Sequence, residues 1–206
     1  MSEHIEVETS AGIGWIALDR PPNARGVLAL THGAGGGVGS ADLRAVRDAA
    51  TAQGIAVALI TQPYRVAGKA TPPRPPVQEP PWLELIAALQ KRRGFANLPL
   101  VVGGRSNGAR LACRTAAACG ASAVVALAYP LHPPGRPDVS RLDELEMPTV
   151  SVLVVQGDRD SFGMPEPGPG RVVVVIEGAD HSLKKGLAKI SESVVSFVLS
   201  GRMTGE

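Results

Sequence analysis

Apolar residues along this chain gather in short runs that alternate with amphipathic, helix-like stretches. Continuous apolar runs of this length are typical of strands buried on both faces of a sheet. They predict strands at residues 13–18, 27–31, 55–60, 99–102, 121–128, 150–155 and 172–176. The first run partly alternates in polarity, which indicates a strand near a sheet edge.

Helical spacing of the apolar positions predicts helices at residues 41–53, 82–93, 109–118 and 191–199. Ser40 is the expected N-cap of the first helix, and Gly54 its stop signal. Such alternation favours an α/β fold, with a mostly parallel, doubly wound sheet flanked by helices. The length of 206 residues fits one domain spanning residues 1–206, and residues 130–148 are too few for a lid domain of several helices.

One segment, residues 63–81, is dense in proline. Because proline lacks a backbone N–H and fixes φ, we expect no regular helix or strand there. Two interpretations remain open for this segment. It is either an extended surface loop or a wall of a substrate cleft, since residues 62–65 follow a strand at the end where α/β sheets bind ligands.

The composition excludes several classes of partner. The formal net charge is only +2 and the basic residues are scattered, which does not indicate nucleic-acid binding. No apolar run approaches the length of a membrane span, and the first residues are polar and acidic, unlike a signal peptide. We therefore expect a soluble, cytoplasmic protein.

The two cysteines, Cys113 and Cys119, lie six residues apart on one predicted helix. This spacing separates them by about 9 Å along the helix axis and places them on different faces, too far apart for a disulfide. We expect two small buried apolar residues. No Cys/His spacing resembles a zinc site, so no metal is predicted.

The most informative motif is the pentapeptide Gly104-Arg105-Ser106-Asn107-Gly108, between a predicted strand and a predicted helix. A serine on such a sharp turn is exposed for attack on a carbonyl carbon, and the flanking glycines prevent steric clashes. A serine nucleophile needs a base, and the base needs an orienting acid. His181 follows the last apolar strand, which predicts it as the base. The acid is expected after the preceding strand, where Asp160 is favoured over Asp158.

Negative charge on the carbonyl oxygen would need two backbone N–H donors. One is expected from Asn107, directly after the serine. The other is expected from the glycine-rich loop that begins at His32, with Ala34 favoured over Gly35. A glycine-rich loop can also hold a phosphate, but this one lacks the residues of the phosphate-binding motifs. We expect His32 to brace the loop rather than to act as a base.

Together, the segments 31–35, 104–108, 156–160 and 179–182 resemble the α/β-hydrolase superfamily in order and spacing. Residues 129–137 and 160–163 are similar to a small, lidless, dienelactone-hydrolase-like subgroup that includes the testis-expressed hydrolase-like proteins. The resemblance implies Ser106 as nucleophile, Asp160 as acid and His181 as base. Asn107 departs from the pattern, because an apolar residue is expected there.

The expected activity is hydrolysis of a small carboxylic ester or related acyl compound, with no cofactor. Thioester or amide cleavage by the same residues, and a non-catalytic scaffold, remain alternatives. The cleft is expected to be lined by Tyr64, Arg65, Arg105, His132 and Phe162. Arg105 has two interpretations, recognition of an acidic substrate or a structural salt bridge. The sequence does not indicate an oligomeric state.

Overall fold

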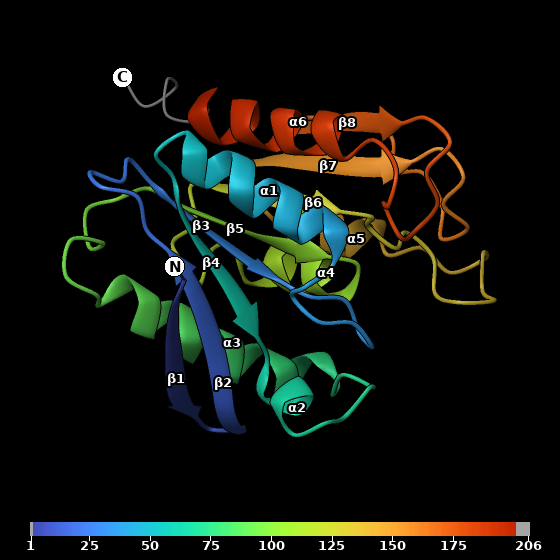
Figure 1. The fold of residues 1–206 in the computed structure, drawn as a ribbon. Helices are drawn as coiled ribbons and strands as arrows, with labels where there is room; N and C mark the ends of the chain where they lie inside the picture. The colour runs from blue at the N-terminus through green and yellow to red at the C-terminus, as the bar shows by residue number, and fades with distance from the viewer. Residues whose placement is uncertain (1, 201–206) are drawn as a thin grey trace.

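Eight strands form one sheet in the computed structural model, which describes residues 2–200 (Figure 1). The ends of the expected 1–206 domain, residue 1 and residues 201–206, lie outside the described residues. In chain order the strands are β1 (Glu3–Thr9), β2 (Gly12–Asp19), β3 (Val27–Thr31), β4 (Ala56–Thr61), β5 (Leu100–Arg105), β6 (Ala123–Leu127), β7 (Ser151–Gly157) and β8 (Arg171–Ile176).

The spatial order of the strands is β1-β2-β4-β3-β5-β6-β7-β8. The pairs β1–β2 and β2–β4 are antiparallel, and every other pair is parallel. Strands β3 and β6 are buried at every position, which explains their continuous apolar sequence. The predicted α/β fold with a mostly parallel, doubly wound sheet is confirmed.

Helices cover both faces of this sheet (Figure 1). Their bounds are α1 (Ala41–Ala52), α2 (Pro63–Val66), α3 (Pro75–Gln90), α4 (Asn107–Thr115), α5 (Leu142–Leu145) and α6 (Leu187–Ser200). Helices α1 and α6 pack on one face around Leu43, Val46 and Val194. Helices α3 and α4 pack on the other around Trp82, Leu85 and Leu111. Within residues 2–200 no helix is both long and apolar enough to cross a bilayer.

The N-terminal strand β1 was not predicted, because its sequence is mostly polar. It forms the edge of the sheet and pairs with β2 along its whole length. Its exposed side chains alternate with half-buried Ile5 and Val7, which pack against the core. His4 therefore lies in a strand, although the polar and acidic sequence around it does not predict one. Its ring lies edge-on to that of Trp15, with the ring centroids 5.6 Å apart.

The expectation that prolines exclude a helix from residues 63–81 is also wrong. Pro63 begins α2, and Pro75 begins α3, which continues through Pro80 and Pro81. Proline at the first helical positions costs nothing, because the N–H groups there have no acceptor within the helix. Pro80 is exposed, whereas Pro81 is buried in the core. The packing of this helix thus outweighs the two hydrogen bonds that its interior prolines remove.

Two smaller expectations agree with the structure. Cys113 and Cys119 are free and buried, the first on α4 and the second beyond its end. Residues 130–148 hold a single four-residue helix, α5, rather than a lid domain. Salt bridges from Arg110 and Arg114 to Glu144 fasten α5 to α4.

Trp82 provides a test of how far the proline-bearing helix supports the core. Its indole is fully buried, and its Nε1–H donates to Thr115 Oγ1 at 3.0 Å. We expect Trp82→Ala to lower the free energy of unfolding by about 3–5 kcal/mol. Trp82→Phe keeps most of the packing but loses the hydrogen bond, so we expect a loss of about 1–2 kcal/mol. Urea unfolding measures both values. Equal losses of unfolding free energy in the two variants would contradict the role of the Trp82 ring in core packing.

Candidate active site

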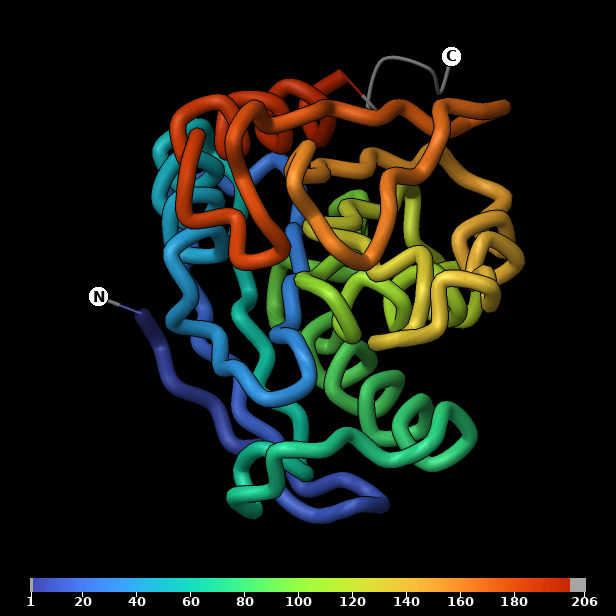
Figure 2. Tube along the Cα trace, turned by 90° about the vertical axis from the view of Figure 1, so that its right-hand side faces the viewer, coloured from blue at the N-terminus to red at the C-terminus, as the bar shows by residue number. Residues whose placement is uncertain are grey.

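The carboxyl ends of the parallel strands meet along one edge of the sheet, which Figure 2 views face on. Ser106 follows β5 there, Asp160 follows β7 and His181 follows β8. Asp160 and His181 thereby reach the same edge as Ser106, although they lie 54 and 75 positions after it in the sequence. This is the side on which open α/β sheets bind ligands.

Ser106 occupies a strained turn between β5 and α4. Its φ of 53° and ψ of −113° lie outside the regions that most residues adopt. Its backbone N–H donates to Leu127 O at 2.9 Å, which continues the pairing of β5 with β6 through the turn. The strain is thus maintained by hydrogen bonding and by the helix that follows.

The flanking glycines are required by close backbone packing. A Cβ atom on Gly104 would lie 2.6 Å from Thr31 O and 2.8 Å from the carbonyl carbon of Gly108. A Cβ on Gly108 would lie 2.8 Å from Thr31 O and from His32 O. Real Cβ atoms do not approach backbone atoms this closely, so only glycine fits at either position.

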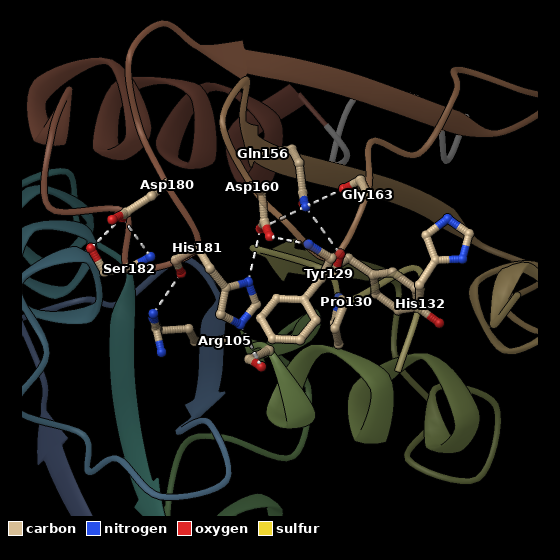
Figure 3. A network of polar contacts seen from close by, with 12 residues as sticks. Arg105, Tyr129, Pro130, His132, Gln156, Asp160, Gly163, Asp180, His181 and Ser182 are labelled. Atoms are coloured by element: carbon tan, nitrogen blue, oxygen red, sulfur yellow. Dashed lines mark hydrogen bonds and ion pairs between the residues drawn. The ribbon is translucent and has the colours of Figure 1, made fainter. Parts of the chain in front are cut away.

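Ser106, His181 and Asp160 form a continuous chain of hydrogen bonds. Ser106 Oγ lies 2.9 Å from His181 Nε2, and His181 Nδ1 lies 2.8 Å from Asp160 Oδ2 (Figure 3). A carboxylate can only accept, so Nδ1 carries the proton and Nε2 is free to accept from the serine hydroxyl. The Asp160 side chain is fully buried, whereas that of His181 is 22% exposed. The imidazole of His181 is therefore anchored on one side and accessible on the other.

Asp160 rather than Asp158 contacts the histidine. Asp160 Oδ1 accepts the backbone N–H of Phe162 at 2.9 Å, and its Oδ2 also accepts from Gln156 Nε2 at 2.8 Å. Asp158 is exposed, and its backbone N–H donates to Ile176 O. The geometry therefore favours Asp160, as the sequence did.

Sequence analysis did not single out Gln156, the last side chain of β7 before Gly157. It is fully buried, and its Nε2 lies within 2.8–3.1 Å of Asp160 Oδ2, Gly163 O and Tyr129 O (Figure 3). All three partners are acceptors, which fixes the orientation of the amide. The sequence did contain a signal for it, because Gln156 is a polar residue at the end of a buried apolar strand. Gln156 ties the acid to the neighbouring loop after β6.

The predicted cleft residues Phe162 and His132 have different surroundings. The Phe162 ring packs against the His181 imidazole, with the ring centroids 4.3 Å apart. His132 points away from His181 in Figure 3, and its Nδ1 lies 2.9 Å from Val139 O. Phe162 thus shields the candidate base, whereas His132 stabilises its own loop.

The glycine-rich loop after β3 lies beside the serine. A Cβ on Gly33 would lie 3.4 Å from Ser106 Cβ, which places the loop against this serine. Among residues 2–200, neither the Ala34 N–H nor the Asn107 N–H has a hydrogen-bond acceptor. Both are therefore available to a ligand. The Asn107 side chain is buried, and its Nδ2 has no partner in the same part of the chain.

His32 braces this loop, as expected. Gln62 N–H donates to its Nε2 at 3.1 Å, so its Nδ1 carries the proton that Gly33 O accepts at 2.8 Å. Burial lowers the pKa of His32 and keeps the ring neutral. Both ring nitrogens are occupied, so His32 has no lone pair left to act as a base.

Arg105 and Tyr64 also hold the site together. The Arg105 guanidinium forms an ion pair with fully buried Asp42 at 3.2 Å, and it donates to His181 O at 2.6 Å. Of its two interpretations, the geometry favours the structural salt bridge.

Tyr64 O–H donates to Ala34 O at 2.9 Å, and Arg65 Nε donates to Gly36 O at 2.9 Å. Both contacts secure the glycine-rich loop.

The donor set for a metal is absent from the described part of the chain. No group of three or more His, Cys, Asp or Glu side chains within residues 2–200 is arranged to bind an ion. Ser106, His181 and Asp160 are instead hydrogen-bonded to one another. The arrangement suits nucleophilic chemistry that uses a proton relay.

Residues 24–194 match the family model described as an alpha/beta hydrolase domain, and the chain belongs to that family. None of the curated proteins matches it in sequence. Solved structures with similar folds include a lidless α/β serine hydrolase from Xanthomonas campestris. It is 18% identical, with 97% of this chain and 94% of that chain covered and a TM-score of 0.79.

Two other solved structures are similar to this chain to the same degree. Est1E from Butyrivibrio proteoclasticus is 16% identical, with 98% of this chain and 99% of that chain covered and a TM-score of 0.78. Dienelactone hydrolase from Anabaena variabilis is 17% identical, covers 97% of each chain and has a TM-score of 0.77. The expected small, lidless, dienelactone-hydrolase-like fold is thus confirmed, and family membership supports a hydrolase.

Gly104→Ala tests the steric basis of the serine turn. The added methyl would meet backbone atoms at 2.6 and 2.8 Å, so we expect a loss of about 1–3 kcal/mol in unfolding free energy or more. Gly39→Ala is the matched control, because a Cβ there meets nothing within 4 Å. Denaturant unfolding of both variants measures the difference. Equal stability of the two would contradict the close packing.

Proposed function

We propose that this protein is a serine hydrolase that cleaves a small carboxylic ester or a related acyl compound. Ser106 is the nucleophile, His181 the general base and Asp160 the acid that orients it. The observation that carries the proposal is the chain of hydrogen bonds of 2.9 and 2.8 Å that begins at a strained serine. The coarser statement, that the chain is an α/β-hydrolase domain, rests on the family match.

The reaction proceeds in two steps. Ser106 Oγ attacks the carbonyl carbon while His181 Nε2 takes its proton, and the imidazolium then protonates the leaving alcohol. This leaves an acyl-serine. A water molecule, deprotonated by the same histidine, attacks the acyl group and releases the acid. Asp160 is ionised throughout and stabilises the charged imidazole.

Two backbone amides stabilise the oxyanion that forms in each step. We assign them to Asn107 and Ala34, whose N–H groups have no acceptor within residues 2–200. Asn107 is the first residue of α4, so the positive end of the helix dipole also favours negative charge there. Removing one such donor typically costs two to three orders of magnitude in rate.

The named structural neighbours support an ester substrate. Est1E, which carries an esterase name, has been solved with ferulic acid bound, and dienelactone hydrolase is named for a lactone. Thioester or amide cleavage would use the same residues. The proposal includes a small-molecule substrate and action in the cytoplasm, without nucleic-acid binding. A non-catalytic scaffold is the alternative that a negative labelling result would favour.

Labelling with a fluorophosphonate probe tests the nucleophile. We expect a covalent adduct on Ser106, mapped by mass spectrometry, and no adduct in Ser106→Ala. His181→Ala removes the base and should slow labelling by about 1,000-fold or more. An adduct on another residue, or an unchanged rate in His181→Ala, would contradict the assignment. Folded protein that is not labelled at all would support the scaffold.

The two aspartates provide a matched comparison. In Asp160→Asn the side chain can donate to Nδ1, which leaves the proton on Nε2 and removes the acceptor for Ser106. We expect kcat for 4-nitrophenyl acetate to fall by about 100- to 10,000-fold. Asp158→Asn, at the exposed neighbouring position, should leave kcat unchanged. Equal effects of the two substitutions would refute the choice of Asp160.

A further inference from the structure

A cavity of about 300 Å³ lies between α2, the start of α3 and the turn that joins β1 to β2. All of its lining residues except Ala11 and Gln62 come from residues 63–81, the segment expected to form either a loop or a cleft wall. Figure 2 shows this segment running across the lower part of the molecule, beside the β1–β2 turn. None of Ser106, Asp160 and His181 lines the cavity, so it is distinct from the site described above.

A chain of buried hydrogen bonds ends at this cavity. Thr31 Oγ1 donates its single proton to Ile60 O at 2.8 Å, so it can only accept from Gln62 Nε2 at 3.2 Å. This fixes the orientation of the Gln62 amide. Its Oε1 then accepts from Gln78 Nε2 at 2.8 Å. Gln78 is consequently oriented as well, with its Oε1 as the last group of the chain.

Gln78 Oε1 accepts no hydrogen bond from the protein among residues 2–200, and it is not one of the fully enclosed atoms there, so a small molecule can reach it. Its side chain is only 2% exposed, and the residue lines the cavity. An accessible amide oxygen with no protein donor can accept a hydrogen bond from a molecule inside the cavity. The cavity therefore offers a ligand one oriented acceptor, which suits an O–H or N–H group.

The other lining residues define the rest of the ligand. Most are apolar: Ala11, Pro63, Ala67, Pro73, Val77 and Pro81. No acidic side chain lines the cavity to balance a cation, and the free acceptor of Gln78 would repel an anion. The Tyr64 hydroxyl donates to Ala34 O and is not available as a second donor. Lys69 also lines the cavity, but its side chain is exposed, so water solvates and screens its charge. The ligand is therefore neutral and mainly apolar.

From this chemistry we infer that the cavity binds a small neutral molecule, or the neutral end of one, with an apolar body and one hydroxyl or amide donor. The donor bonds to Gln78 Oε1, and the apolar body packs against Val77 and the prolines. The inference does not depend on the hydrolase proposal. Tyr64 joins the two sites, since it lines the cavity and also holds the carbonyl of Ala34.

Benzyl alcohol and benzyl methyl ether are suitable probes, because they share an apolar ring and only the alcohol has a donor. We expect benzyl alcohol to shift amide NMR signals of the cavity residues in a saturable manner, with a Kd in roughly the millimolar range for so small a ligand. The ether should bind about 2- to 10-fold more weakly, which is the value of one net hydrogen bond. Equal binding of the two probes, or no saturable shift, would overturn the inference.

Variants locate the binding. Gln78→Leu should remove the preference for the alcohol, so that both probes bind alike. Val77→Trp, at a position that is 59% exposed, should block the cavity and weaken both probes. Val172→Trp, on a comparably exposed position of β8 outside the cavity, is the control and should bind as the parent does. If Gln78→Leu does not fold, the ratio of the Kd values for the alcohol and the ether in the unmodified protein still tests whether a donor is preferred. Parent-like binding by Val77→Trp would refute the location.

Discussion

The close contact of β5 and α4 with β3 is the constraint on which the rest of the site depends. Thr31 O lies where side chains on Gly104 and Gly108 would have to be, so these backbones meet almost directly. The chain can pass from β5 into α4 at this distance only through a sharp turn, and Ser106 adopts a φ of 53° as a result. The same contact brings the serine beside the loop that follows β3. Steric exclusion thus determines both the exposure of the hydroxyl and its distance from the candidate oxyanion donors.

Arg105 extends this constraint to the other side of the site. Arg105 directly precedes Ser106, and its guanidinium connects fully buried Asp42 on α1 with the carbonyl of His181. A buried carboxylate without a positive partner would cost several kcal/mol, so the ion pair holds α1, β5 and the histidine loop in one arrangement. The contacts of Arg105 thus favour a positioning role over substrate contact. This explains why a charged residue beside the serine need not indicate a charged substrate.

Much of the fold could be predicted from sequence, since buried parallel strands have continuous apolar runs and the serine motif lies between a strand and a helix. The edge strand β1 could not, because Glu3–Thr9 buries only part of one face and reads as polar. The helix predicted at 82–93 was found, but the start of α3 at residues 75–81 was missed. Proline at the first position loses no amide hydrogen bond, and packing outweighs the bonds that Pro80 and Pro81 remove. Gln156 was missed because its partners at Tyr129 and Gly163 are defined only by the tertiary fold.

Gln62 connects the two halves of this edge of the sheet. Its backbone N–H holds His32, which in turn braces Gly33, while its side chain orients Gln78 in the cavity. One residue thus supports the candidate oxyanion loop through its main chain and the cavity through its amide. Displacing Gln62 would leave both the His32 nitrogen and the Gln78 amide without partners, each at the cost of a buried unsatisfied group. The position of the proline-rich segment is therefore tied, through Gln62, to the loop that lies beside Ser106.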